Sequence, residues 1–96
     1  MDTEILDEIF RVVEDRRDNP KPNSYVSSLL TQGLDAILKK IGEEATELVV
    51  AAKGSNQQFV IHETADLMFH ILVLLASQRI PLNAILNELK GRRKGP

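Results

Sequence analysis

The chain has 96 residues, of which 43% are hydrophobic, and a formal net charge of -2. This length suits one domain with a modest core, and the slightly negative charge excludes a general affinity for nucleic acid or anionic membranes. The absence of cysteine excludes disulfides, zinc–thiolate sites and thiol nucleophiles. We therefore expect residues 1–96 to form a single domain.

The start of the chain is acidic and lacks the basic and apolar regions of a signal peptide. The most apolar run, residues 67–76, is far shorter than the roughly 20 residues that span a bilayer. These observations predict a cytoplasmic protein that does not enter membranes.

The first predicted helix covers residues 3 to about 17, where apolar residues recur at helical spacing. Thr3 is suited to cap its start, and Arg16 and Arg17 complement the negative end of the helix dipole. Phosphate binding is the alternative role of these two arginines.

A loop is predicted next, because residues 18–24 read DNPKPNS and are rich in proline and asparagine. Ser24 is expected to cap a short helix that ends at Gly33. This helix carries Tyr25, the only tyrosine of the chain, which we interpret as a core or interface residue.

Two longer helices are predicted at about residues 34–53 and 57–78, followed by a turn at 79–81 and a last helix at 82–90. The sequence shows no strand alternation, so the predicted fold class is all-α, with four to five helices in an antiparallel bundle. The segment 57–78 is apolar on more sides than a small monomer can cover. We therefore expect homodimerisation to complete the core.

Five carboxylates occupy the two longer helices. Glu44 and Glu47 are three residues apart, as are Glu63 and Asp66, so each pair lies on one side of a helix, one turn apart. Glu43 is the fifth acid. Two such helices packed face to face would bring four carboxylates around one point. Because like charges repel at that distance, we expect a hard divalent cation such as Mg²⁺, which takes oxygen ligands.

Helical-wheel positions distinguish a site from a solvated acidic face. Glu44 and Glu47 flank the apolar stripe of their helix, and Lys40 lies one turn before Glu44. Asp66 and His70 lie on a segment that is otherwise almost entirely apolar, so we expect both to enter a core or a deep cleft. A solvated or salt-bridged acidic face is the alternative.

The predicted substrate is a phosphate ester or anhydride, because Mg²⁺ is usually held by a few carboxylates together with phosphates and waters. One carboxylate would act as general base, and Lys40 would contact a phosphate oxygen. His70 has two open roles: acid–base or hydrogen-bonding work beside Asp66, or a satisfied core histidine bonded to Asp66 or a carbonyl. Gly42 either permits close approach of a helix or ligand or is merely tolerated.

Two other functions would use the same acids. Di-iron and di-manganese bundles use Glu-x-x-His motifs, which the chain lacks, so oxidative di-metal chemistry is disfavoured. A non-catalytic helical interaction module would leave buried acids unexplained and predicts no Mg²⁺ binding.

The residues EEATE at 43–47 and ETAD at 63–66 match the E-E-x-x-E … E-x-x-D signature of the MazG-like all-α nucleotide pyrophosphohydrolases. The sequence around these acids indicates a more specific family. SYVSSLLTQGLDAILKKIGEEATELVVAAK and ETADLMFHILVLL closely resemble the phosphoribosyl-ATP pyrophosphatases of histidine biosynthesis. The resemblance covers roughly residues 3–93.

This resemblance implies hydrolysis of 1-(5-phosphoribosyl)-ATP to 1-(5-phosphoribosyl)-AMP and diphosphate, with Mg²⁺ as cofactor and a homodimer whose helices meet at the site. The metal ligands it implies are Glu44, Glu47, Glu63 and Asp66. The catalytic residues it implies are Glu43, Glu44 and Glu47, and the phosphate contacts are Lys40 and Lys53. No cyclohydrolase domain adjoins, so the next reaction is expected to belong to another chain. The alternative within the superfamily is a house-cleaning pyrophosphatase that acts on ordinary or damaged nucleoside triphosphates.

Overall fold

The computed structural model describes residues 3–93, which form five α-helices and no strand. The helices are α1 (Glu4–Asp18), α2 (Tyr25–Gln32), α3 (Leu34–Lys53), α4 (Gln57–Ser77) and α5 (Leu82–Gly91). The all-α prediction is confirmed, and the predicted ends of each helix lie within one or two residues of the observed ones.

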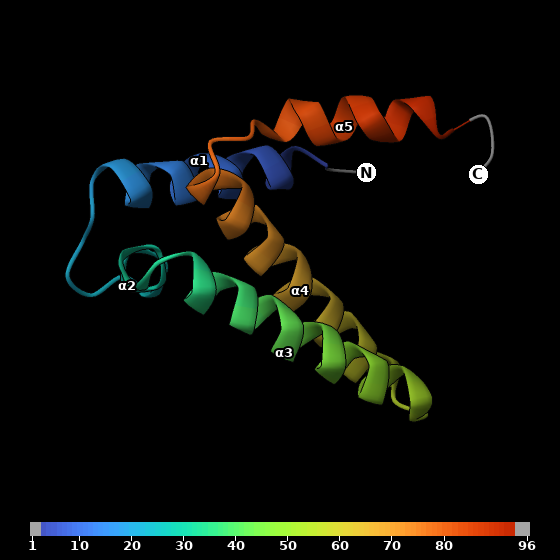
Figure 1. Ribbon diagram of the computed structural model, residues 1–96. Coiled ribbons are helices and arrows are strands. Elements are labelled where there is room, and N and C mark those ends of the chain that lie inside the picture. The colour runs from blue at the N-terminus through green and yellow to red at the C-terminus, as the bar shows by residue number, and fades with distance from the viewer. Residues whose placement is uncertain (1–2, 94–96) are drawn as a thin grey trace.

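The long helices α3 and α4 pack against each other as an antiparallel hairpin (Figure 1). α1 crosses the hairpin at the end away from its turn, and α2 packs against α1, α3 and α4. α5 leaves this bundle and runs back beside the first part of α1, where the two helices line a groove of about 520 Å³. The antiparallel arrangement that we predicted is therefore concentrated in α3 and α4.

The short helix α2 is delimited by local sequence signals. The Ser24 side chain accepts a hydrogen bond from the Ser27 backbone amide at 3.1 Å, as predicted for a cap. Gly33 separates α2 from α3. Its φ of +103° is a backbone conformation that residues with a side chain rarely adopt. The predicted cap by Thr3 is wrong, because its backbone is already helical and its side chain makes no capping hydrogen bond.

The core lies where α1 and α2 meet the α3–α4 hairpin. Val13, Ile37 and Val73 are its largest fully buried side chains. The other core residues are Phe10, Val26, Leu29, Leu72, Leu75, Ala76 and Leu82. Because these residues come from all five helices and recur at helical spacing, the apolar stripes of the sequence position the hairpin and hence its acids.

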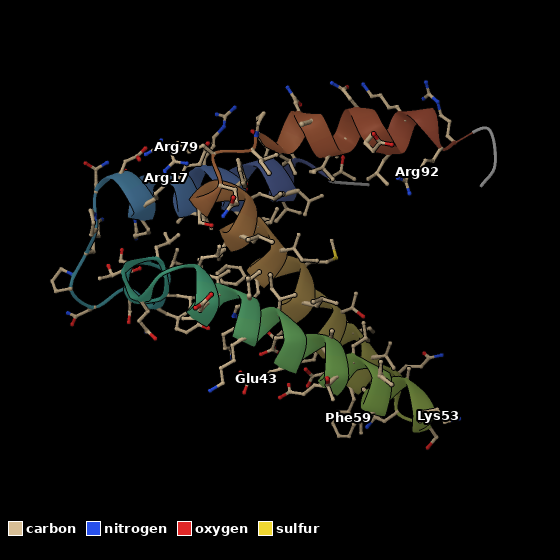
Figure 2. The ribbon with its side chains drawn as sticks, viewed as in Figure 1. Arg17, Glu43, Lys53, Phe59, Arg79 and Arg92 are labelled. Atoms are coloured by element: carbon tan, nitrogen blue, oxygen red, sulfur yellow. The ribbon has the colours of Figure 1, made fainter. Side chains whose placement is uncertain are left out.

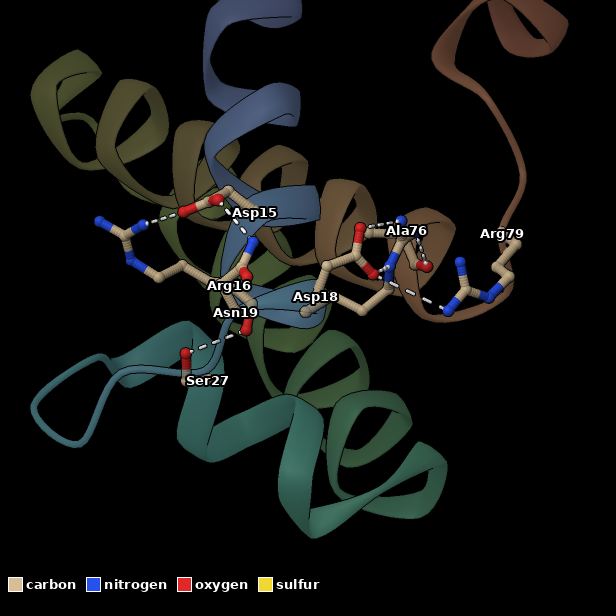
Figure 3. A network of polar contacts seen from close by, with 8 residues as sticks. Asp15, Arg16, Asp18, Asn19, Ser27, Ala76 and Arg79 are labelled. Carbon is tan, nitrogen blue, oxygen red and sulfur yellow. Dashed lines mark hydrogen bonds and ion pairs between the residues drawn. The ribbon is translucent and has the colours of Figure 1, made fainter.

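Polar contacts tie the end of α1 to the end of α4 (Figure 3). The Arg17 guanidinium donates a hydrogen bond to the Ala76 carbonyl at 2.9 Å and also pairs with Asp18. Arg79, whose φ is +57°, ends the turn after α4 and approaches Asp18 at 3.8 Å. The Ser27 hydroxyl donates to the Arg16 carbonyl at 3.1 Å. In this structure Arg17 therefore caps the C-terminal end of α4.

One chain does not cover all sides of the apolar run 67–76, as predicted, since Met68 and Ile71 are exposed. Further apolar side chains are exposed toward the turn of the hairpin: Val49, Val50, Phe59 and Ile61. Among the described residues, α4 is the one helix long and apolar enough to cross a membrane. Core helices of soluble proteins meet the same criterion, so it is weak support for a membrane segment.

Candidate functional site

Three glutamates meet between α3 and α4. Glu44 and Glu47 come from α3 and Glu63 from α4, and one carboxylate oxygen of each lies within 4.8 Å of the other two. The i,i+3 spacing turns the α3 pair toward α4, and the antiparallel packing sets Glu63 opposite them. These three sequence-predicted acids therefore form one cluster, which we call the glutamate cluster.

Glu44 is the buried member of the cluster, with 5% of the residue exposed. Its Oε1 atom accepts from Lys40 Nζ at 3.2 Å, as their i,i+4 spacing predicts. Its Oε2 atom is buried and has no hydrogen-bond partner within the described part of the chain, and the same holds for Glu63 Oε2. A buried carboxylate oxygen without a partner is costly, so a cation fits the space between these atoms.

Electrostatics within the cluster support the same conclusion. The pKa of Glu47 is raised, first by a side-chain hydrogen bond to Glu63 and then by the negative charge of Glu44. The pKa of Lys40 is also raised, chiefly by its bond to Glu44. The negative charge of the cluster thus favours a nearby positive charge, either a proton on Glu47 or the ammonium group of Lys40.

Asp66 joins a neighbouring group rather than the glutamate cluster. One ligand atom each of His62, Glu63 and Asp66 lies within 4.8 Å of the others, so Glu63 belongs to both groups. Asp66 Oδ2 lies 3.3 Å from His62 Nε2, and 41% of the Asp66 side chain is exposed. The prediction of one point with four acids holds for three of them, because Asp66 pairs with His62 instead. The expected burial of Asp66 in a core or deep cleft is only partial in this chain.

His62 was missed as a site residue by sequence reasoning. Its i,i+4 spacing to Asp66 on α4 was the available signal, since residues four apart on a helix are neighbours.

His70 is the buried residue one turn after Asp66. Its Nδ1 atom lies 2.7 Å from the Asp66 backbone carbonyl, and its Nε2 atom lies 2.8 Å from the Tyr25 hydroxyl. The predicted alternative of a satisfied core histidine bonded to a carbonyl is thus confirmed. Tyr25 is not a core residue of this chain, because 51% of it is exposed.

Glu43 belongs to neither acid group, and Lys53 is the last residue of α3 (Figure 2). Both are exposed, Glu43 midway along α3 and Lys53 at its last residue, where the hairpin turns. A Cβ atom added to Gly42 would meet nothing within 4 Å in the described chain. Within one chain, therefore, no other helix packs closely against Gly42.

A shallow groove of about 300 Å³ borders the glutamate cluster. It is lined by Thr46, Glu47, Val50, Ala51, Phe59 and Glu63. Oxygen-only ligands beside an open groove suit a hard divalent cation together with a phosphate-bearing molecule.

Comparison with known proteins agrees with this chemistry. A family model described as phosphoribosyl-ATP pyrophosphohydrolase matches residues 6–93. The chain belongs to this family. The predicted resemblance is thereby confirmed over nearly the whole chain.

Individual relatives of the phosphoribosyl-ATP pyrophosphohydrolase family are similar along their lengths. A phosphoribosyl-ATP pyrophosphatase of Methanocella arvoryzae is 47% identical over 95% of this chain and 98% of its own length. One from Trichlorobacter lovleyi is 51% identical over 92% of this chain and 82% of its own. One from Clostridium novyi is 44% identical, with coverages of 95% and 83%.

The raised pKa of Glu47 predicts how the metal-free fold depends on pH. The folded state holds this proton more tightly than the unfolded chain, so protonated Glu47 adds stability below the ordinary glutamate pKa of about 4.3. That stability is lost as pH rises through the raised value. In thermal unfolding with chelator from about pH 4 to about pH 8, Glu47→Gln should flatten this loss. Glu8→Gln on α1 is the control, and identical profiles for wild type and Glu47→Gln would contradict the prediction.

Proposed function

We propose that this protein hydrolyses phosphoribosyl-ATP to phosphoribosyl-AMP and diphosphate in histidine biosynthesis. The observation that carries the proposal is the glutamate cluster, in a chain of the phosphoribosyl-ATP pyrophosphohydrolase family. Two of its oxygens are buried and have no partner in the described part of the chain. The names of the relatives supply the substrate, and the cluster supplies the chemistry expected for it.

The proposed cofactor is Mg²⁺, held by Glu44, Glu47, Glu63 and Asp66. The fit is supported by the oxygen-only donor set and by the orphaned oxygens of Glu44 and Glu63. When bound, Mg²⁺ would offset the phosphate charge and lower the pKa of a water molecule. Glu63 belongs to both acid groups, so it would join Asp66 to the cluster.

The chain's own residues would divide the remaining work. Glu47 is the exposed acid of the cluster and borders the groove, so we assign it the role of accepting the proton of the attacking water. As the water oxygen bonds to phosphorus, the anhydride bond to diphosphate breaks. Lys40 now pairs with Glu44, and a cation on Glu44 would free its ammonium group to contact phosphate. Lys53 and Glu43, both exposed on α3, are proposed as outer contacts to phosphate and water.

A homodimer in the cytoplasm is the proposed assembly, with residues 1–96 as its single domain. Support comes from the apolar side chains that one chain leaves exposed on α3, α4 and α5, among them Val50, Phe59 and Leu89. Exposed apolar surface of this extent is typical of a subunit interface.

The direct test of the function is diphosphate release from phosphoribosyl-ATP, measured beside a panel of ordinary nucleoside triphosphates, with Mg²⁺ and with chelator. We expect fast release from phosphoribosyl-ATP that chelator abolishes. Glu44→Gln should lose at least about a hundredfold in turnover and keep its fold, because it removes a ligand and relieves repulsion. Glu8→Gln, at an exposed position of α1, is the matched control.

Diphosphate release from the ordinary nucleoside triphosphates alone would support the hydrolysis reaction. It would contradict phosphoribosyl-ATP as the substrate. No release from any substrate, with no effect of Mg²⁺ on thermal unfolding, would favour the interaction module and contradict the proposal.

The dimer predicts that dissociation and unfolding are coupled. Because the core would be shared, dilution should lower the unfolding midpoint together with the molecular mass. Sedimentation and thermal unfolding across a concentration series measure both quantities. A monomer whose unfolding midpoint stays constant on dilution would defeat the dimer.

A further inference from the structure

Tyr25 and His70 connect two helices beside the acids, although 45 residues separate them in the sequence. Tyr25 is the first residue of α2, and its hydroxyl lies 2.8 Å from Nε2 of the buried His70 on α4. The rings meet edge to face, with centroids 5.8 Å apart. A hydrogen bond and a ring contact together fix the beginning of α2 on α4.

The polarity of this connection follows from its far end. The Asp66 backbone carbonyl only accepts hydrogen bonds, so His70 Nδ1, 2.7 Å away, carries a proton and donates it. In the neutral ring Nε2 is then an acceptor, and the Tyr25 hydroxyl is its donor. The two hydrogen bonds therefore run from the Tyr25 hydroxyl through the His70 ring to the backbone carbonyl of Asp66 on α4.

Lys40 of α3 lies near Tyr25. The pKa of Lys40 is raised chiefly by Glu44, and Tyr25 is close enough to contribute. α2 is only eight residues long, and Gly33 alone separates it from α3. Helices this short depend on tertiary contacts for their position, so the Tyr25 bond also fixes how α3 begins.

We propose that Tyr25 and His70 are positioning residues of the acidic site. They hold the α4 turn of Asp66 in register with Lys40 and Glu44 on α3, so that the carboxylates are in place before a cation binds. This inference rests on the proposed function, because it assigns the pair a role toward Mg²⁺. It goes beyond that function, because neither residue touches a carboxylate of the glutamate cluster.

The test is Mg²⁺ affinity measured by titration calorimetry on the full chain, without substrate. Tyr25→Phe removes only the hydroxyl. His70→Asn keeps a donor near the Asp66 carbonyl but places no atom where Nε2 lies. Each variant should weaken Mg²⁺ binding by about tenfold, the lower end of the effect of residues that orient metal ligands. The double variant should be no weaker than either single variant, because both remove the same bond.

Ser27→Ala is the matched control. It removes the two hydrogen bonds of the buried Ser27 hydroxyl, which donates to the Arg16 carbonyl and accepts from the Lys21 amide, and neither involves an acid of the site. It should lower the unfolding midpoint and leave Mg²⁺ affinity unchanged. Tyr25 also supplies a spectroscopic readout, since the chain has one tyrosine and no tryptophan. His70→Asn should change tyrosine emission even without Mg²⁺, because it removes the partner of the hydroxyl. Saturating Mg²⁺ should leave wild-type emission nearly unchanged, because the pair is already in place.

The possible results separate the two proposals. Wild-type affinity in both Tyr25→Phe and His70→Asn would overturn the positioning role and leave the proposed function standing. An equal loss of affinity in Ser27→Ala would overturn it as well, by reducing the pair to general stability. A wild type that binds no Mg²⁺ would overturn the proposed cofactor together with this inference.

Discussion

Repulsion among three carboxylates is the constraint on which the rest of this structure depends. Glu44, Glu47 and Glu63 converge within 4.8 Å, and two of their oxygens are buried without a hydrogen-bond partner among residues 3–93. Left alone, such charges would push α3 and α4 apart. The two helices stay together because apolar side chains on both pack into one core. The free energy of that packing holds the acids in an arrangement that a cation then stabilises.

The other helices serve this hairpin from its far end. α1 and α2 cover the part of α4 that holds Val73 and Ala76, and Arg17 caps the Ala76 carbonyl. On the side nearer the acids, Tyr25 reaches His70 and so connects α2 with the turn of Asp66. The apolar core and the acidic site thus occupy successive parts of α4, with His70 at the boundary between them.

Much of the fold was predictable because its signals are local. Apolar periodicity gave the helices, Ser24 gave a cap, and the break at Gly33 separated α2 from α3. The same periodicity placed Glu44 and Glu47 beside the apolar stripe of α3, and in the structure both lie close to Glu63 of α4. The family followed from the residues around these acids, and the family model supports it independently.

The remaining features depend on contacts that spacing does not encode. Tyr25 and His70 are paired by the way α2 packs on α4. No local sequence pattern predicts a hydrogen bond between residues that are 45 positions apart. Asp66 was expected in a core or a deep cleft because its neighbours are apolar, yet it pairs with His62 and 41% of its side chain is exposed.

The most direct measurement is anomalous diffraction from crystals grown with Mn²⁺, which takes the oxygen ligands of Mg²⁺ and can be located by its scattering. A peak within coordination distance of Glu44, Glu47 and Glu63 is the result predicted by a cation-dependent site. Well-ordered carboxylates with no peak between them, at saturating Mn²⁺, would contradict it.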